Sequence, residues 1–206
     1  MGLMASSRKA KARISSRGRP APTNWVQARS ESLLRIANRY RFQGKYKKAE
    51  SLYRQALSIA EKSFGPGHLE VATTLNELAV LYKYMARFGE ASRLYRRALS
   101  IMERSLNSEH PDIATLYHNL GGLEHARRRY ARGEPFARRA VEIREKALGP
   151  NHPDVAADIA ALAAILDGQQ KFDESKKLYK RAIAIFEKEL GPDHYELAVN
   201  FNNLAA

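Results

Sequence analysis

The chain has 206 residues, 44% of them hydrophobic, and no cysteine, which excludes disulfides, zinc–thiolate sites and cysteine nucleophiles. Its net charge is +13, and residues 1–30 hold seven basic residues and no acidic one, so that 28 basic residues face 22 acidic ones in the remainder. No stretch approaches the roughly 20 apolar residues of a membrane-spanning helix, and no apolar core of a secretory signal is visible near the N-terminus.

Residues 1–22 are rich in Ser, Arg, Lys, Gly and Pro and almost lack large apolar side chains. This composition predicts a disordered basic tail, because it cannot bury enough apolar surface to offset the entropy of ordering. Two other interpretations stay open: an arm that binds nucleic acid or another acidic surface, and an Arg- and Ser-rich transit peptide that targets an organelle. Without such targeting we expect a cytoplasmic protein.

Helical structure is predicted to begin at Asn24, because Asn24 and Gln27 have the spacing of a capping box. Trp25 lies just inside this helix and is the only tryptophan in the chain. It has no counterpart later in the sequence, and we expect it to cover the exposed end of the folded part.

From about residue 30 onward the sequence repeats with a period of 42 residues. Near-copies of one segment surround four histidines, His68, His110, His152 and His194, and read GPGHLEVA, NSEHPDIA, GPNHPDVA and GPDHYELA. A fixed period of this size predicts a solenoid, in which each unit packs only on its neighbours. The solenoid is expected to span residues 23–206, with units at about 30–71, 72–113, 114–155 and 156–197 and a half unit at 198–206.

Within each unit, apolar and small residues form two helical stripes, at positions 4, 7, 8 and 11 and at positions 17, 20, 24, 27 and 28. Each unit is therefore predicted to be a pair of helices, here called helix A and helix B. Small residues at positions 8, 20 and 27 let the two helices approach closely, and position 27 is always alanine: Ala56, Ala98, Ala140 and Ala182. Gly-Pro, or Asn-Ser in the second unit, predicts the end of helix B. The His-Pro-Asp segment or its variant then starts the next helix A.

The third unit is irregular. Arg127, Arg128 and Arg129 precede its aromatic residue, and Pro135 lies early in its helix B. Because proline lacks a backbone N–H and clashes with the preceding turn, we expect this helix to begin late or to bend.

The spacing of small, aromatic and alanine positions resembles the tetratricopeptide repeat. The strings LNELAVLYKYMARFGEASRLYRRALSIMERSL and ALGPNHPDVAADIAALAAI are similar to the 42-residue variety found in kinesin light chains and many bacterial repeat proteins. The resemblance covers about residues 25–206. It implies an all-α, right-handed superhelical solenoid of antiparallel helix pairs that acts as a protein–protein interaction scaffold. A scaffold of this kind binds an extended or helical peptide segment in its concave groove.

A second stripe on helix A, at positions 2, 5, 9 and 12, lies on a helix face away from the core. In the family this face lines the concave groove, and an asparagine at position 5 holds the peptide backbone through an amide that both donates and accepts. Basic residues on this face predict a ligand with acidic residues near the first two units, and His125 is expected to add charge at mildly acidic pH. The candidate groove residues are Asn38, Arg41, Asn76, Lys83, His118, His125 and Asn202.

No metal site is expected at the four repeated histidines, because they lie in different units, about 10 Å apart, whereas ligands share a metal at roughly 2 Å. Helix capping is the better interpretation. No phosphate-binding loop, nucleophile elbow or metalloprotease motif occurs, so we expect no enzyme, no catalytic residue and no cofactor. Two alternatives remain: nucleic-acid or acidic-surface binding through the tail and the Arg127–Arg132 cluster, and a homo-oligomer formed through Phe201 and Leu204 in the half unit.

Overall fold

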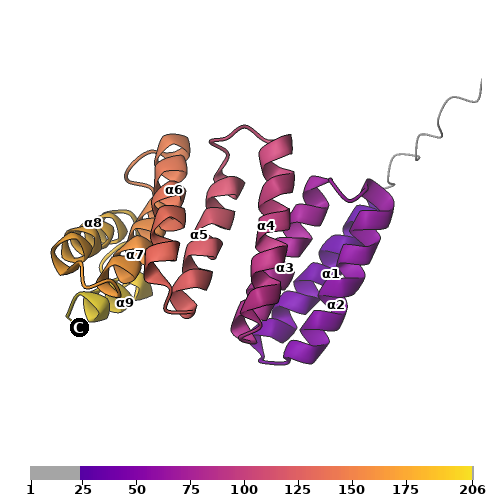
Figure 1. Cartoon of the computed structure of the whole chain (residues 1–206), viewed down its shortest axis with the longest axis horizontal. Coiled ribbons are helices and arrows are strands. Elements are labelled where there is room, and N and C mark those ends of the chain that lie inside the picture. The colour runs from indigo at the N-terminus through magenta and orange to yellow at the C-terminus, as the bar shows by residue number, and fades with distance from the viewer. Residues whose placement is uncertain (1–23, 206) are drawn as a thin grey trace, which may run out of the picture.

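The computed structural model of the chain describes residues 24–205, where it contains nine helices and no strand (Figure 1). None of these helices is both long enough and apolar enough to cross a membrane. The predicted tail, residues 1–22, lies outside the described residues. The helices are α1 (Asn24–Phe42), α2 (Tyr46–Phe64), α3 (Leu69–Tyr84), α4 (Phe88–Ser105), α5 (Pro111–Ala126), α6 (Tyr130–Leu148), α7 (Pro153–Asp167), α8 (Phe172–Leu190) and α9 (Tyr195–Ala205).

Successive helices pack as antiparallel pairs, and the pairs follow one another along the long axis (Figure 1). We call the pairs α1–α2, α3–α4, α5–α6 and α7–α8 units 1 to 4; α9 packs on α8 as a further helix A. The predicted fold class, an all-α solenoid of antiparallel helix pairs, is therefore confirmed.

Small side chains bring the two helices of each unit together. The four alanines at position 27 are all fully buried. In unit 3 the approach is so close that a Cβ atom placed on Gly133 would lie 3.2 Å from the carbonyl oxygen of Gly121. The packing therefore depends on the near absence of side chains at this crossing.

The repeated histidines cap the A helices, as predicted. In His68, His110 and His152 the ring Nδ1 accepts a hydrogen bond from the backbone N–H two residues further on, at 3.2, 3.1 and 3.1 Å. His194 repeats this contact at 3.4 Å. Each ring satisfies one of the N–H groups that a helix N-terminus leaves without a partner, so the period of the histidines is the period of the helix starts.

Two local features differ from expectation, and a bend of α6 at Pro135 stays a prediction. Helix α6 does not begin late: it starts at Tyr130, as α4 starts at Phe88. Its first turn forms before Pro135, with the carbonyl oxygen of Arg129 accepting hydrogen bonds from the N–H groups of Arg132 and Gly133 at 2.9 and 3.1 Å. Trp25 does not cover the end of the fold, because its side chain is 63% exposed; the neighbouring Val26 is buried instead.

Ion pairs between neighbouring B helices join unit 1 to unit 2 and unit 3 to unit 4. Between α2 and α4, Arg97 pairs with Glu61 at 2.6 Å. Between α6 and α8, Arg181 pairs with Glu145 at 2.5 Å. In each case the arginine also donates to a proline carbonyl oxygen in the loop after the earlier helix.

Arg139 of α6 and Glu103 of α4 occupy the equivalent positions, but they do not pair with each other. Arg139 pairs with Glu142 of its own helix, and Glu103 accepts a hydrogen bond from Tyr117. Within residues 24–205, no ion pair joins α4 to α6. Units 2 and 3 are instead joined by packing, by the hydrogen bond from Tyr117 to Glu103, and by an ion pair at 3.2 Å between Lys146 of α6 and Glu109 in the loop after α4.

Candidate functional site

The predicted groove residues lie on four A helices. Asn38 and Arg41 come from α1, Asn76 and Lys83 from α3, and His118 and His125 from α5. Asn202 is exposed on α9, two units beyond His118. Contacts between side chains divide the first six residues into a cluster at units 1 to 3 and a second cluster at units 3 and 4.

In the first cluster, Asn38 holds its neighbours in place. Its side-chain oxygen accepts hydrogen bonds from the Tyr53 hydroxyl at 2.6 Å and from Arg41 Nη2 at 2.8 Å. Arg41 Nη2 also lies 3.5 Å from a carboxylate oxygen of Glu77 on α3. Burial raises the pKa of Tyr53 to about 12, so the hydroxyl stays a donor at neutral pH. Asn38 therefore positions Arg41 rather than offering a free amide to a ligand.

Asn76 bridges two units. Its side-chain oxygen accepts a hydrogen bond from the amide of Asn119 on α5 at 2.8 Å, and its own amide donates to Glu77 at 3.4 Å. Asn119 was not a sequence candidate, because nothing in a single unit shows which side chain of the next unit it meets. A peptide backbone held by Asn76 would compete with this amide–amide contact.

Lys83 is a half-buried cation on the same face. Its ammonium nitrogen lies over Gly122 of α5, 3.6 Å from where a Cβ atom would stand. Burial and the nearby Arg41 both lower the pKa of Lys83. Throughout residues 24–205 no carboxylate is within ion-pair distance of this ammonium. Burial and Lys83 also lower the pKa of His125, which opposes the charge predicted for it at mildly acidic pH.

Two exposed aromatic side chains border these cations. Phe42 and Tyr84 end helices α1 and α3 and are 82% and 60% exposed. The guanidinium carbon of Arg41 lies 5.0 Å from the centre of the Phe42 ring and 5.9 Å from that of Tyr84. Sequence reasoning missed both, since they stand one residue after the groove stripe. We call Arg41, Phe42, Lys83 and Tyr84 the cationic groove segment.

Tyr53 and Tyr95 occupy the same position in units 1 and 2, but only Tyr53 has a hydrogen-bond partner. Val80 stands where unit 1 has Asn38, and no group in the described part of the chain is a hydrogen-bond partner of the buried Tyr95 hydroxyl. We expect Tyr53→Phe to lower the free energy of unfolding by about 1 kcal/mol and Tyr95→Phe to leave it unchanged or raise it by up to about 1 kcal/mol. Urea unfolding followed by circular dichroism measures both. Equal losses in the two variants would contradict this assignment.

The second cluster ties unit 3 to unit 4 through His118. Its Nδ1 lies 2.7 Å from a carboxylate oxygen of Asp158 on α7, whose other oxygen accepts from Nε of Arg144 on α6 at 2.6 Å. Asp158 is 2% and Arg144 is 8% exposed. Arg144 also donates to the Thr115 hydroxyl at 3.2 Å, and a cavity of about 270 Å³ lies beside the network. His118 is thus a contact between units, a role that its place on the groove stripe did not reveal.

The half unit is represented by α9. Leu204 packs against the buried cluster formed by α7, α8 and α9, whereas Phe201 is 52% exposed. Asn200, which the sequence did not single out, is buried, and its side-chain oxygen has no hydrogen-bond partner among the residues that the structure describes. Self-association through Phe201 stays a prediction.

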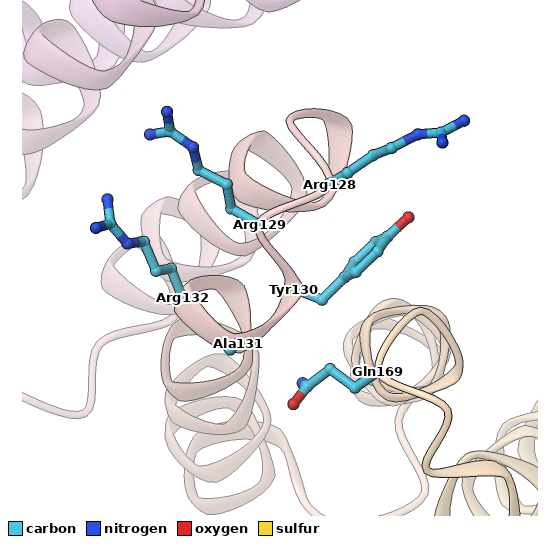
Figure 2. Close-up of a pocket in the computed structure, with 6 residues that line it drawn as sticks. All are labelled: Arg128, Arg129, Tyr130, Ala131, Arg132 and Gln169. Carbon is cyan, nitrogen blue, oxygen red and sulfur yellow. The ribbon is translucent and has the colours of Figure 1, made fainter.

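The basic cluster of unit 3 lies at the turn between α5 and α6. Arg127 pairs with Glu124 at 3.3 Å, but Arg128, Arg129 and Arg132 have no carboxylate within ion-pair distance in the described part of the chain. A cavity of about 550 Å³ is lined by these three arginines with Tyr130, Ala131 and Gln169 (Figure 2). Arg138 and Arg139, further along α6, are both paired with glutamates.

Known structures share this architecture. The putative kinesin light chain with nearly identical TPR-like repeats from Podosopora anserina is 26% identical and superposes with a TM-score of 0.73, over 86% of this chain and 84% of that one. BtubC (BKLC) from P. vanneervenii is 28% identical with a TM-score of 0.76, over 87% of this chain and 71% of that one.

A more distant likeness concerns the fold alone. Aspartyl phosphate phosphatase F from Bacillus subtilis is 15% identical with a TM-score of 0.69, over 81% of this chain and 42% of that one. A comparison with curated proteins finds no match.

The sequence also matches the family of the tetratricopeptide repeat over residues 29–104, 112–188 and 156–206. Together these ranges take in more than half of the chain, and they agree with the helix pairs, the small residues at their crossings and the kinesin light chain-like structures. Repeats of this kind form scaffolds for protein–protein interaction. The chain belongs to the tetratricopeptide repeat family.

Proposed function

We propose that the concave groove binds an extended or helical segment of a partner protein, and that acidic residues of this segment meet the cationic groove segment in units 1 and 2. Lys83 carries the proposal. A half-buried ammonium loses hydration without gaining a carboxylate partner, and a ligand carboxylate would supply the missing charge. Arg41 supports the same conclusion. Among residues 24–205 its only ion pair is the 3.5 Å contact with Glu77, and its buried Nε has no hydrogen-bond partner there.

The aromatic rings favour a peptide over a free ion. Phe42 and Tyr84 expose large apolar surfaces, and their ring centres lie 5.0 and 5.9 Å from the guanidinium carbon of Arg41. Exposed aromatic residues beside an arginine are typical of the residues that dominate protein interfaces. We infer that apolar side chains of the segment pack on these rings while its carboxylates reach Arg41 and Lys83. The groove residues with free or exchangeable side chains are then Arg41, Asn76, Lys83 and His125, whereas Asn38 and His118 act through the residues that they hold.

Affinity capture at physiological salt tests this function. Four baits are compared: the full chain, a chain lacking residues 1–22, a Lys83→Glu chain, and a Lys62→Glu chain as a control with the same change in charge at an exposed residue of α2. We expect one client to be retained by the first, second and fourth baits and to bind Lys83→Glu at least about tenfold more weakly, because a like charge in the groove repels its carboxylates.

A client that instead requires residues 1–22, or that is released by nuclease or by modest salt, would contradict the groove proposal. Such behaviour is typical of phosphate contacts made by a basic arm. A segment excised from the client, measured by fluorescence anisotropy against the same variants, then gives the affinity ratio directly. Dividing the dissociation constant of the Lys83→Glu variant by that of the Lys62→Glu variant removes the contribution of overall charge to the affinity.

A further inference from the structure

The residue that precedes each B helix is a cation, and in two of the junctions between units it binds carboxylates. Arg87, before α4, donates to both oxygens of Glu50 in unit 1 at 2.9 and 3.0 Å, and it also pairs with Glu90 three residues on. Lys171, before α8, donates to Glu134 of unit 3 at 2.7 Å. The charge at each of these turns is therefore neutralised by the preceding unit or by the helix itself.

Arg129 stands at this position before α6, and both of its expected partners are replaced. Ser92 occupies the position of Glu50 and Glu134, and Arg132 occupies the position of Glu90. The junction between units 2 and 3 has thus lost two carboxylates and gained a second guanidinium. In the part of the chain that the structure describes, neither Arg129 nor Arg132 has an acidic partner.

The two guanidinium groups are placed to act together. Figure 2 shows the side chains of Arg129 and Arg132 extending to the same side of the turn, with Arg128 and Tyr130 pointing to the other side. Arg128 and Arg129 of the turn line two open cavities of about 550 and 560 Å³, the second of which is also lined by residues of unit 2. The N-terminus of α6, which has no side-chain cap, adds its partial positive charge to the same region.

We propose that Arg129 and Arg132 bind a carboxylate from an acidic loop of a partner protein at this edge of the solenoid. In the junction between units 1 and 2, the guanidinium of Arg87 binds two carboxylates. In the junction between units 2 and 3, the guanidinium groups of Arg129 and Arg132 would bind a single carboxylate, which the partner supplies. Guanidinium forks match a carboxylate in two parallel hydrogen bonds. The inference rests on the proposed function as a protein-binding scaffold, but it places a second contact outside the groove, where no ion pair joins α4 to α6.

A nuclear magnetic resonance titration tests the site on the full chain. The probe is an acetylated, amidated peptide of four glutamates, and the signals followed are the Nε–Hε groups of the arginines. We expect the Arg129 and Arg132 signals to shift together and to saturate. The Arg129→Gln/Arg132→Gln variant should bind the probe at this site about fivefold or more weakly, since each exposed ion pair contributes a few-fold. Arg35→Gln/Arg39→Gln, two exposed arginines of α1, is the control with the same loss of charge.

The Ser92→Glu variant distinguishes specific binding at Arg129 and Arg132 from a general electrostatic attraction between the acidic probe and a basic protein. It keeps both arginines but restores the carboxylate that Glu50 and Glu134 provide in the other junctions. The Arg129 and Arg132 signals should then respond little to the probe. Unchanged binding in Ser92→Glu, or an equal loss in the Arg35→Gln/Arg39→Gln control, would overturn the proposal. Tighter binding of an oligouridylate than of the glutamate peptide at these signals would also overturn it, in favour of nucleic acid.

The same spectra keep this site apart from the groove. Shifts of the Arg41 signal with none at Arg129 and Arg132 would leave the groove function standing and remove the second contact. Shifts at Arg129 and Arg132 with none at Arg41 would support the second contact and contradict binding of acidic residues in the groove.

Discussion

Replacing Asp158 by alanine is expected to lower the free energy of unfolding by about 3–5 kcal/mol, because it leaves the buried Arg144 guanidinium without its carboxylate. Asp158 is nearly inaccessible and binds Arg144 at 2.6 Å and His118 at 2.7 Å. The substitution therefore removes contacts to α5 and α6 at once. Urea unfolding followed by circular dichroism measures the loss, which would be the largest of any single substitution considered for this protein.

Two further variants show whether the buried charge is the cause. Asp154 is 61% exposed and lies 4.0 Å from Arg144, so Asp154→Ala should change the free energy of unfolding by less than about 0.5 kcal/mol. Unit 2 has Met102 at the position of Arg144, and unit 3 has Leu116 at the position of Asp158. The double variant Arg144→Met/Asp158→Leu should recover most of the stability, because it removes both charges together. A double variant as unstable as Asp158→Ala would contradict this reasoning.

Glu134→Gln is expected to lower the free energy of unfolding by about 2 kcal/mol at neutral pH, after allowance for partial exposure of the pair. One oxygen of Glu134 accepts from Lys171 at 2.7 Å and from Gln169 at 2.8 Å, and the other accepts from Arg138 at 2.9 Å. The hydrogen bond from Lys171, with those from Gln169 and Arg138, lowers the pKa of Glu134 to about 2 against the burial that raises it.

The pH dependence identifies the charged form as the stabilising one. Because the pKa is lower in the folded state than the ordinary value of 4.5, the stabilisation is complete above pH 4.5 and is lost as the pH falls towards 2. The difference between the wild type and Glu134→Gln should shrink over this range. Glu142→Gln, which removes ion pairs on the exposed face of α6, should leave stability unchanged. A difference that persists at pH 2 would point to packing instead of charge.

The repeat made the fold predictable because its determinants are local. Ala140 must be small for two helices of the same unit to cross, and His152 caps the helix that begins right after it. Both requirements act within a few residues or within one helix pair, so they recur with the period of the sequence. The late start expected from Pro135 and the cover expected from Trp25 failed for the same reason: each was argued from one residue, whereas neighbouring hydrogen bonds form the first turn of α6 and Val26 is the residue that is buried.

The candidate site was less predictable because its side chains are paired across units. The groove stripe placed Asn38, Asn76 and His118 on one helix face. It did not predict their hydrogen-bond partners, which are Tyr53, Asn119 and Asp158. Those contacts depend on which residue of a neighbouring helix stands opposite, and helical periodicity carries no information about that. The absence of a partner at Lys83, which carries the functional proposal, likewise became visible only when the neighbouring helices were in place.

The pairing of Arg97 with Glu61 and of Arg181 with Glu145 gives the solenoid an electrostatic period twice as long as its sequence period. The chain can be regarded as two modules, α1–α4 and α5–α8, each of which contains all the ion pairs between its own B helices. A break or a flexible insertion in the loop between α4 and α5 would leave every one of those pairs intact, whereas the same change between α2 and α3 or between α6 and α7 would separate their partners. Helices could therefore be added, removed or exchanged two pairs at a time at this loop without breaking an ion pair between B helices among residues 24–205; the Lys146–Glu109 ion pair and the hydrogen bonds from Tyr117 to Glu103 and from Asn119 to Asn76 do cross it.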